Sequence, residues 1–465
     1  MKEKFDLVVV GSGPGGYVAA VRAAQLGFRT ALIERDQMGG VCLNWGCIPT
    51  KALLRGAELA HSLSQAQAFG ITVGDVAIDV SRLVAHSRQV AAKLSGGIDY
   101  LMQKNGISVI RGSARLSAKC ELTVATDQGD RIVGAEHIIL ATGAHARELP
   151  GIAIDGERVW GAREAMTPSS VPARLLIIGA GAIGVEFASL YHDLGSEVIL
   201  VEALDRILPV EDEEVSAFIH KAFTSRGITV HTRARVEAAT PDANGVVVQL
   251  RGADGELQQI SADRLIQAVG ISGNITELGL EALAVETSRG FIVTDDYCRT
   301  NLVGLYAIGD VAGPPWLAHK ASHEAVLCVE KIAGVEGVHP LDATRIPGCT
   351  YCRPQVASVG LTEAQARATG RPVKVGRFNL AANGKALAIA EAQGFVKTIF
   401  DSGSGELLGA HMVGPEVTEQ IHGYALARSM EATEADLMHT VFPHPTLSEA
   451  MHESVLDAWD MAINQ

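Results

Sequence analysis

Two cysteines separated by four residues offer the clearest chemistry in this sequence. Cys42 and Cys47 lie in the segment 39–51, which begins with two glycines. Two thiols at this spacing are typical of a redox disulfide, in which one sulfur exchanges with a dithiol and the other faces a flavin. A zinc site would need a second pair of ligands, and none is evident nearby. Two buried structural cysteines are the alternative.

A glycine-rich turn precedes the cysteines. Gly11, Gly13 and Gly16 follow the apolar run 5–10 and open a helical segment, and the next strand ends at Glu34. Glycines in this pattern allow a tight turn and the close approach of a pyrophosphate to a helix N-terminus, while the acidic residue binds the ribose hydroxyls. The segment therefore predicts a dinucleotide site, with Pro14 as part of the turn.

The same pattern occurs a second time. Gly179, Gly181 and Gly184 follow the apolar strand 174–178, and Glu202 stands at the same distance from the first glycine as Glu34 does in the first pattern. A carboxylate binds a free 2′-hydroxyl and repels a 2′-phosphate, so the second site should prefer NAD to NADP. We expect two bound dinucleotides.

Three further apolar segments end where parallel strands would meet a nucleotide. Each is also compatible with an ordinary strand–turn junction, and their order along the chain supports the nucleotide interpretation. The residues at their ends are Thr142 and Gly143, Gly270, and Asp310, whose carboxylate could hold a flavin ribityl hydroxyl.

Composition restricts the setting of the protein. The chain has 465 residues, 47% of them hydrophobic, and a net charge of −14. This composition is typical of a large α/β protein and argues against nucleic acid or an anionic membrane as partner. The N-terminal residues lead directly into the first strand, without room for a signal peptide, so we expect a cytoplasmic location. No metal site is expected.

The C-terminal part has a different pattern. A helix is predicted at 318–332, and the segments 355–361, 395–400 and 407–413 read as strands of an antiparallel sheet. We interpret the chain from Pro347 onward as a separate domain.

A histidine near the C-terminus is a candidate acid–base group. His444 lies between two prolines, and Glu449 follows five positions later, where it could orient the imidazole. The segment 446–449 is equally a helix capping box, which would explain Glu449 without catalysis. A cis bond between His444 and Pro445 would set the direction of the ring.

Taken together, these motifs resemble the dihydrolipoamide dehydrogenase family, within the class I pyridine nucleotide-disulfide oxidoreductases. The resemblance covers essentially the whole chain, in order and spacing. The motifs are GGVCLNWGCIPTK at 39–51, the second glycine pattern followed by Glu186, Gly309–Asp310, LAHK at 317–320 and HPTLSE at 444–449.

The resemblance implies an α/β fold with two Rossmann-like dinucleotide-binding domains, for FAD and NAD, a central domain and an α+β C-terminal dimerisation domain. The implied boundaries are 1–147 for the FAD domain, 148–272 for the NAD domain, 273–343 for the central domain and 344–465 for the dimer interface domain.

The resemblance also implies residue roles. Cys42 is similar to the thiol that exchanges with dihydrolipoamide, and Cys47 to the thiolate that faces the flavin. Lys51 is similar to a lysine near the flavin that pairs with Glu186, and His444, with Glu449, to the base that acts in the partner subunit's site. Ala318 joins the implied cofactor-binding residues. Two departures from the family are Thr50, in place of a commoner serine, and Phe442, where many relatives have a histidine.

The implied reaction oxidises dihydrolipoyl groups, borne by an acyltransferase or a lipoyl carrier protein, and reduces NAD. A glutathione-reductase-like enzyme is the nearest alternative, although it would favour arginines over Glu202, and a docking subunit of a multienzyme complex is another. The sequence leaves open which 2-oxoacid, acetoin or glycine-cleavage complex is served.

Cys349 and Cys352 form a CxxC motif on a strand-like segment, which would send their side chains to opposite faces. The sequence offers no partner for Cys120, Cys298 and Cys328, which we expect to be inert.

Overall fold

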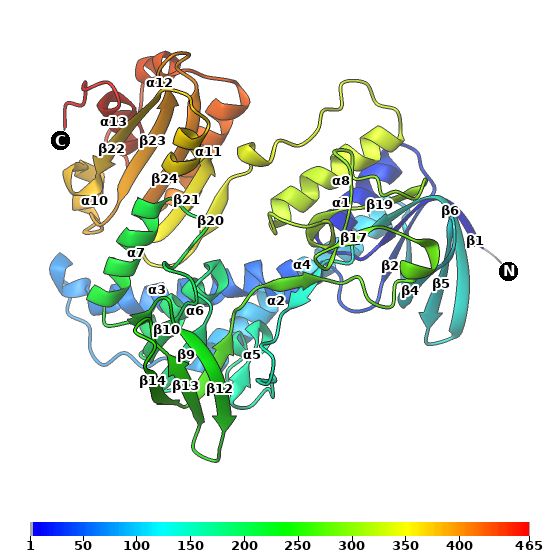
Figure 1. Cartoon of the computed structure of the whole chain (residues 1–465), viewed down its shortest axis with the longest axis horizontal. Helices are drawn as coiled ribbons and strands as arrows, with labels where there is room; N and C mark the ends of the chain where they lie inside the picture. The colour runs from blue at the N-terminus through cyan, green and yellow to red at the C-terminus, as the bar shows by residue number, and fades with distance from the viewer. Residues whose placement is uncertain (1–2, 465) are drawn as a thin grey trace. The chain divides into compact units, whose positions relative to one another are not determined.

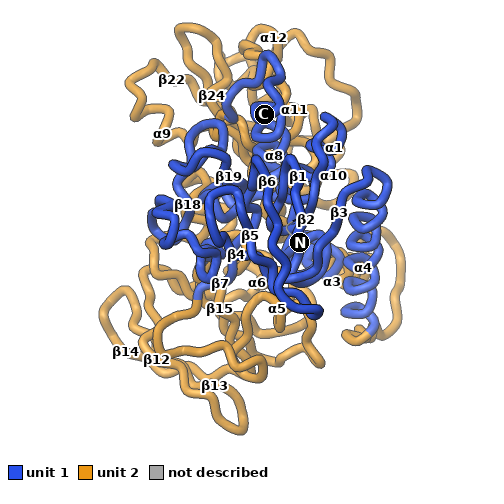
Figure 2. The backbone as a smooth tube through the Cα atoms, turned by 90° about the vertical axis from the view of Figure 1, so that its right-hand side faces the viewer, with its two compact units in different colours: residues 1–53, 82–147, 270–341 blue, residues 54–81, 148–269, 342–465 orange. Residues whose placement is uncertain are grey.

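The computed structural model describes residues 3–464 and comprises two compact units. Unit 1 contains the described residues up to Leu53 together with Arg82–Arg147 and Gly270–Leu341, and unit 2 contains Leu54–Ser81, Glu148–Val269 and the described residues from Asp342 onward (Figure 2). Each unit draws mainly on two of the four predicted domains, and the finer division stays a prediction.

A seven-stranded sheet forms the centre of unit 1. β5 and β4 are antiparallel to their neighbours, whereas the other strands pair in parallel. In spatial order the strands are β3 (Ser108–Arg111), β2 (Thr30–Glu34), β1 (Glu3–Val10), β6 (Gly129–Leu140), β5 (Glu121–Thr126) and β4 (Ser113–Ala118), with β19 (Leu305–Ala307) also paired to β6.

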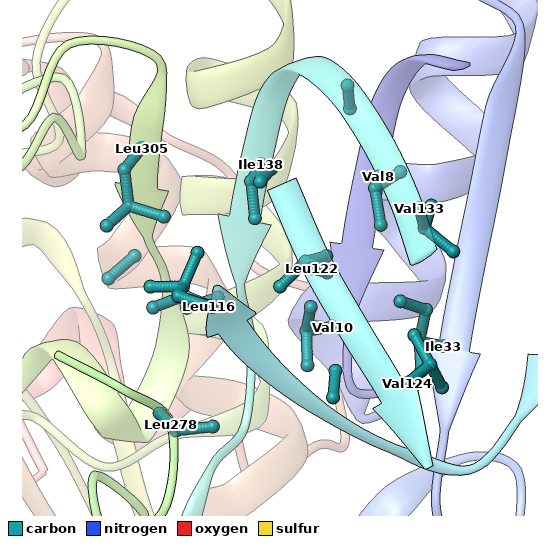
Figure 3. Close-up of a cluster of buried hydrophobic side chains, with 14 of the residues drawn as sticks. Val8, Val10, Ile33, Leu116, Leu122, Val124, Val133, Ile138, Leu278 and Leu305 are labelled. Carbon is teal, nitrogen blue, oxygen red and sulfur yellow. The ribbon is translucent and has the colours of Figure 1, made fainter. Parts of the chain in front are cut away.

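The uninterrupted apolar run of β1 reflects burial on both faces of this sheet. Because side chains alternate along a strand, Val8 and Val10 face one core cluster and Leu7 and Val9 the other. Figure 3 shows Val8 and Val10 in the cluster that β4 and β5 complete. The second cluster includes residues of α1 (Pro14–Gln25), α4 (Val80–Lys104) and α8 (Ala318–Ile332). α8 has the predicted bounds.

Short elements complete unit 1. They are β7 (Ala144–Ala146) paired with β16 (Ile271–Gly273), β17 (Thr287–Ser288) paired with β18 (Phe291–Ile292), α2 (Gly40–Trp45), and the first residues of α3 (Cys47–Ser64), which continues into unit 2.

Unit 2 contains a second parallel sheet (green in Figure 1). The glycine turn after its strand β9 leads into α6, which repeats the β1–α1 arrangement of unit 1. The strands in order are β11 (Thr229–His231), β10 (Glu197–Val201), β9 (Arg174–Ile178), β15 (Arg264–Gln267) and β8 (Val159–Trp160), with α5 (Ala162–Ala165), α6 (Ala182–Asp193), α7 (Glu213–Ser225) and the antiparallel β12 (Arg235–Pro241), β13 (Val246–Arg251) and β14 (Leu257–Ala262).

The C-terminal part of unit 2 is the predicted antiparallel sheet, with the predicted strands observed as β21, β23 and β24. Its order is β20 (Gly348–Thr350), β21 (Gln355–Gly360), β24 (Leu407–Gly414), β23 (Phe395–Asp401) and β22 (Val373–Asn379), with α9 (Glu363–Ala368), α10 (Gly384–Ala388), α11 (Val417–Ser429), α12 (Glu434–His439) and α13 (Glu449–Asp457). Across residues 3–464, no helix has the length and apolar character needed to cross a membrane.

Candidate active site

The first glycine turn has the shape of a phosphate cradle. A Cβ on Gly11 would lie 2.3 Å from the carbonyl oxygen of Ala141, and one on Gly16 would lie 1.8 Å from that of Gly11, so the backbone itself requires both glycines. A Cβ on Gly13 would meet nothing within 4 Å. The open space therefore lies at the N-cap of α1, where backbone N–H groups and the helix dipole favour an anion.

Glu34 lies at the end of β2, beside this turn. One carboxylate oxygen accepts hydrogen bonds from the backbone N–H and the hydroxyl of Ser12, at 2.8 and 2.6 Å, and the other accepts the N–H of Asp36 at 2.8 Å. Each oxygen has two lone-pair sites, and the bonds to backbone N–H groups keep the side chain in one orientation. Acceptor capacity remains for the predicted ribose hydroxyls, and that contact stays a prediction.

The second turn has nearly the same geometry. A Cβ on Gly179 would lie 2.3 Å from Ala268 O and one on Gly184 would lie 1.9 Å from Gly179 O, whereas one on Gly181 would meet nothing. Glu202, at the end of β10, accepts the N–H groups of Ala180 and Leu204 at 2.7 and 2.8 Å. Both sites thus fit a dinucleotide, and the contact of Glu202 with the ribose stays a prediction.

The two predicted redox cysteines are neighbours in space. Cys42 lies on α2, Cys47 is the first residue of α3, and their side chains are hydrogen-bonded to each other in the dithiol state. The contact with Cys47 and burial raise the pKa of the Cys42 thiol, while the nearby Lys51 lowers it. The contact therefore disfavours two thiolates at once, so that one thiol of the pair keeps its proton.

The redox helix α2 packs directly on the first glycine turn. The N–H of Gly39 donates to the backbone carbonyl of Ser12 at 3.1 Å, and a Cβ on Gly40 would lie 2.7 Å from the Cα of Gly13. Gly40 is therefore needed for this close approach, and Gly39, with a φ of +93°, for the turn that leads into α2. After α2, the Thr50 hydroxyl donates to Gly46 O at 2.7 Å, a bond that a serine would also make.

The predicted strand ends of unit 1 carry a polar network. Thr142 exchanges hydrogen bonds with Asn274, and Gly143 O accepts the N–H of Asn274. Asp310 follows β19, and burial raises the pKa of its carboxyl, an effect that Lys320 opposes. Ala318 is the first residue of α8, and Gly270 has a φ of +105° next to β16.

Glu324 is a residue of this network that the sequence reasoning missed. It pairs with the buried Lys320 at 2.8 Å and accepts the N–H of Gly309 at 2.7 Å. The i, i+4 spacing of Lys320 and Glu324 in a predicted helix was the available signal.

Glu449 contacts the imidazole of His444, whereas the capping box is not formed, because α13 begins at Glu449 with Ser448 as its N-cap and no side-chain cap hydrogen bond. One carboxylate oxygen lies 2.8 Å from Nδ1 of His444, and the other accepts the N–H of Thr446 at 2.9 Å. Although burial opposes it, these two bonds lower the pKa of Glu449. His444 is 77% exposed at its side chain, and its bond to Pro445 is cis, as predicted. Phe442 stacks on His452 with ring centroids 5.2 Å apart.

Glu186 is buried in α6, where it accepts the N–H of Tyr351 at 2.9 Å. Its predicted pairing with Lys51 would join the two units and stays a prediction.

The other cysteines have separate environments. Cys349 Sγ donates to Thr418 O at 3.8 Å and Cys352 Sγ to Pro354 O at 3.0 Å. Cys298 and Cys328 are buried and hydrogen-bonded to each other, and burial raises the pKa of Cys328. Within residues 3–464, no group of three or more His, Cys, Asp and Glu side chains is arranged to hold a metal ion.

Two family models match the chain. One, described as pyridine nucleotide-disulphide oxidoreductase, covers residues 5–325, and the other, its dimerisation domain, covers residues 346–455. The chain belongs to the pyridine nucleotide-disulphide oxidoreductase family. Dihydrolipoyl dehydrogenases of Rhizobium etli and Zymomonas mobilis are each 52% identical to it, over 480 and 465 aligned residues, with 100% of both chains covered. That of Bacillus subtilis is 40% identical, also over 100% of both chains.

Solved structures of this oxidoreductase family agree with the fold. LpdA from Mycobacterium tuberculosis matches with a TM-score of 0.90 and 27% identity, and the Cu(II) complex of the HOCl-induced flavoprotein disulfide reductase RclA from Escherichia coli with a TM-score of 0.88 and 27% identity. Each match covers 97% of this chain and 99% of the other. The predicted family, α/β fold, enzyme class and cofactors FAD and NAD are confirmed, and the chain carries a dimerisation domain.

Proposed function

We propose that this chain is a dihydrolipoyl dehydrogenase that oxidises protein-bound dihydrolipoyl groups through the Cys42–Cys47 pair. The observation that carries the proposal is the contact between the two thiols on a helix packed against the first dinucleotide turn. The relatives that are 52% identical over the full chain have this activity in their names. The carboxylate of Glu202 favours NAD and disfavours the glutathione-reductase-like alternative.

The side chains account for the dithiol exchange as follows. His444, oriented by Glu449, takes a proton from a substrate thiol, and the thiolate attacks Cys42 of the disulfide form. The Cys42–Cys47 bond breaks, and Cys47 leaves as a thiolate. The second substrate thiol then displaces Cys42, so the substrate becomes a disulfide and the protein a dithiol. When bound, FAD would supply the acceptor for these two electrons, and NAD would be the final hydride acceptor.

Lys51 and Asp310 supply the setting for this chemistry. Lys51 lowers the pKa of Cys42 electrostatically, and a cation at this position stabilises negative charge close to the thiol pair. The polar strand ends of unit 1, with Asp310, provide hydrogen-bonding groups for the FAD ribityl chain and phosphates.

The proposal includes the assembly and its partners. The protein acts as a homodimer in which His444 of each subunit serves the partner's thiol pair, a role supported by the dimerisation domain and by the high exposure of His444. Its substrate is the dihydrolipoyl group of an acyltransferase or lipoyl carrier protein in the cytoplasm.

Oxidation of dihydrolipoamide by the purified holoenzyme, assayed with NAD and with NADP, tests the function. We expect NAD-linked turnover that Cys42→Ser abolishes while FAD stays bound, because only the exchange sulfur is lost. Cys349→Ser, a partly exposed cysteine in a different environment, should retain activity. Wild-type lipoamide turnover by Cys42→Ser would refute the proposed role.

A further inference from the structure

The redox helix α2 is fastened to α4 near both of its ends. Near the start of α2, the hydroxyl of Ser95 donates to the carbonyl oxygen of Met38 at 2.7 Å. At its end, the guanidinium of Arg88 donates to the carbonyl oxygen of Asn44. The two contacts lie on either side of Cys42, and all of these residues belong to unit 1.

The spacing of the two contacts on α4 matches the length of α2. Arg88 and Ser95 are seven residues apart, so they lie on the same face of α4, separated by about 10.5 Å at 1.5 Å per residue. The six residues of α2 span about 9 Å by the same measure. A rigid helix of 25 residues therefore serves as a splint for a helix too short to be stable alone.

Arg88 meets the end of α2 with more than one contact. Its guanidinium carbon lies 4.3 Å from the centre of the Trp45 ring, in a cation–π arrangement. Trp45 is the last residue of α2, and only Gly46 separates it from Cys47. Arg88 thus supplies a donor to a C-terminal carbonyl of the helix and fixes the ring next to the turn that carries Cys47.

Asn44 links the two ends of α2 through its own side chain. Its side-chain amide, which is buried, donates to Met38 O at 2.9 Å and to Gly40 O at 3.0 Å. Met38 O therefore accepts hydrogen bonds from both Asn44 and Ser95. Because the carbonyl of Asn44 also accepts the bond from Arg88, Asn44 connects the two points at which α4 contacts α2.

We propose that Arg88 and Ser95 are positioning residues that hold Cys42 and Cys47 at the spacing from which their disulfide closes. This inference rests on the proposed redox function of the pair and adds the part of the fold that sets its potential. Loss of the splint gives the dithiol form more conformations than the disulfide form, which lowers the effective concentration of one thiol for the other. The disulfide then becomes easier to reduce.

The test is a redox titration of the thiol pair in the FAD-bound protein. Holoenzyme is equilibrated in glutathione buffers of graded potential, alkylated, and the Cys42–Cys47 peptide is analysed by mass spectrometry, a readout independent of turnover. For Arg88→Gln we expect roughly a tenfold fall in effective concentration, which raises the midpoint potential by about 30 mV. Ser95→Ala should change it in the same direction by a smaller amount. Arg88→Lys should restore part of the loss, because it keeps the charge without the planar fork.

Lys93→Gln provides the matched control, since it removes one positive charge from an exposed position of the same helix. Its midpoint potential should equal that of the wild type. The splint would be overturned if the effective concentration changed by less than about twofold in both Arg88→Gln and Ser95→Ala with FAD still bound. An equal shift of the midpoint potential in Lys93→Gln would overturn it as well. Failure of the proposed redox role of the pair gives a different result, because the wild-type protein would then show no reversible Cys42–Cys47 disulfide.

Discussion

At the scale of single residues, two glutamates define the ends of the two nucleotide-binding strands. Glu34 and Glu202 each accept backbone N–H groups from the glycine turn and from the residue two positions later. The carboxylate therefore shapes the loop, and we expect the same two oxygens to offer lone pairs to the ligand. Replacing the carboxylate changes both the loop shape and the ligand contact, so separate variants are needed to distinguish these two effects.

Glu202→Arg should reverse the coenzyme preference. Loss of a charged hydrogen bond, worth about 1.5–3 kcal/mol, is expected to weaken NAD use by about tenfold or more, and a guanidinium should improve NADP use by a similar factor. The measurement is kcat/KM for both coenzymes. Glu202→Gln keeps an acceptor for Ala180 N–H and serves as the control for loop shape. An unchanged NAD/NADP ratio in Glu202→Arg would mean that Glu202 does not contact the ribose.

At the scale of secondary-structure elements, one buried lysine connects three of them. Lys397 of β23 is 1% exposed, and its Nζ lies 2.8 Å from carboxylates of Asp212, Glu214 and Glu363. Asp212 caps α7, Glu214 lies in its first turn, and Glu363 begins α9. Burial opposes the charged forms, yet hydrogen bonds with the acids raise the pKa of Lys397. The bonds with Lys397 help to lower the pKa values of the three acids, and for Glu214 the bond with Arg377 contributes most.

Lys397→Met should destabilise unit 2 strongly, because it leaves the buried carboxylate of Asp212 without its cation, whereas Glu214 and Glu363 keep Arg377. Removing one partner of a buried ion pair costs about 3–5 kcal/mol, which chemical denaturation can measure. Lys385→Met, at an exposed position of α10, should have little effect. A loss below about 1 kcal/mol would contradict a structural role for the cluster.

The same cluster has a defined pH dependence. Folding lowers the pKa values of the three acids. Their contribution to the free energy of unfolding is therefore present above the unfolded pKa values near 4 and is lost as the pH falls through the folded pKa values. The pKa of Lys397 is raised, so its contribution is complete below about 10.4 and is lost at higher pH. The difference in the free energy of unfolding between wild type and Lys397→Met should therefore be largest from about pH 5 to pH 10.

At the scale of the whole molecule, the proposed dimer divides each active site between two chains. A heterodimer of a Cys42→Ser chain and a His444→Gln chain contains one intact site of the two. Mixed refolding of these inactive variants should restore up to about a quarter of wild-type activity, because half of a random mixture is heterodimer. The assay is dihydrolipoamide oxidation with NAD. No recovery, once subunit mixing is demonstrated by tagged chains, would place His444 in the site of its own chain or outside catalysis.

The sequence by itself determined the features that depend on local backbone geometry. Spacing within a few tens of residues predicts the glycine turns, the acidic strand ends, the cysteine pair, α8 and the C-terminal strands. It does so because turn conformation, helix period and strand alternation are properties of short segments. The same reasoning left the role of Glu449 undecided. The structure shows the contact with His444 and a second contact with Thr446 N–H, one from each carboxylate oxygen, but no capping box, because α13 begins only at Glu449.

Only the tertiary structure decided which distant segments support these motifs. Arg88 and Ser95 contact carbonyls 44 and 57 residues away, and Lys397 reaches Asp212 across 185 residues. Nothing in the local pattern distinguishes Arg88 from other arginines on helix surfaces, or shows that Cys298 and Cys328 lie together. Such contacts depend on the path of the whole chain, because packing, and not local propensity, selects the side chains that meet in the folded core.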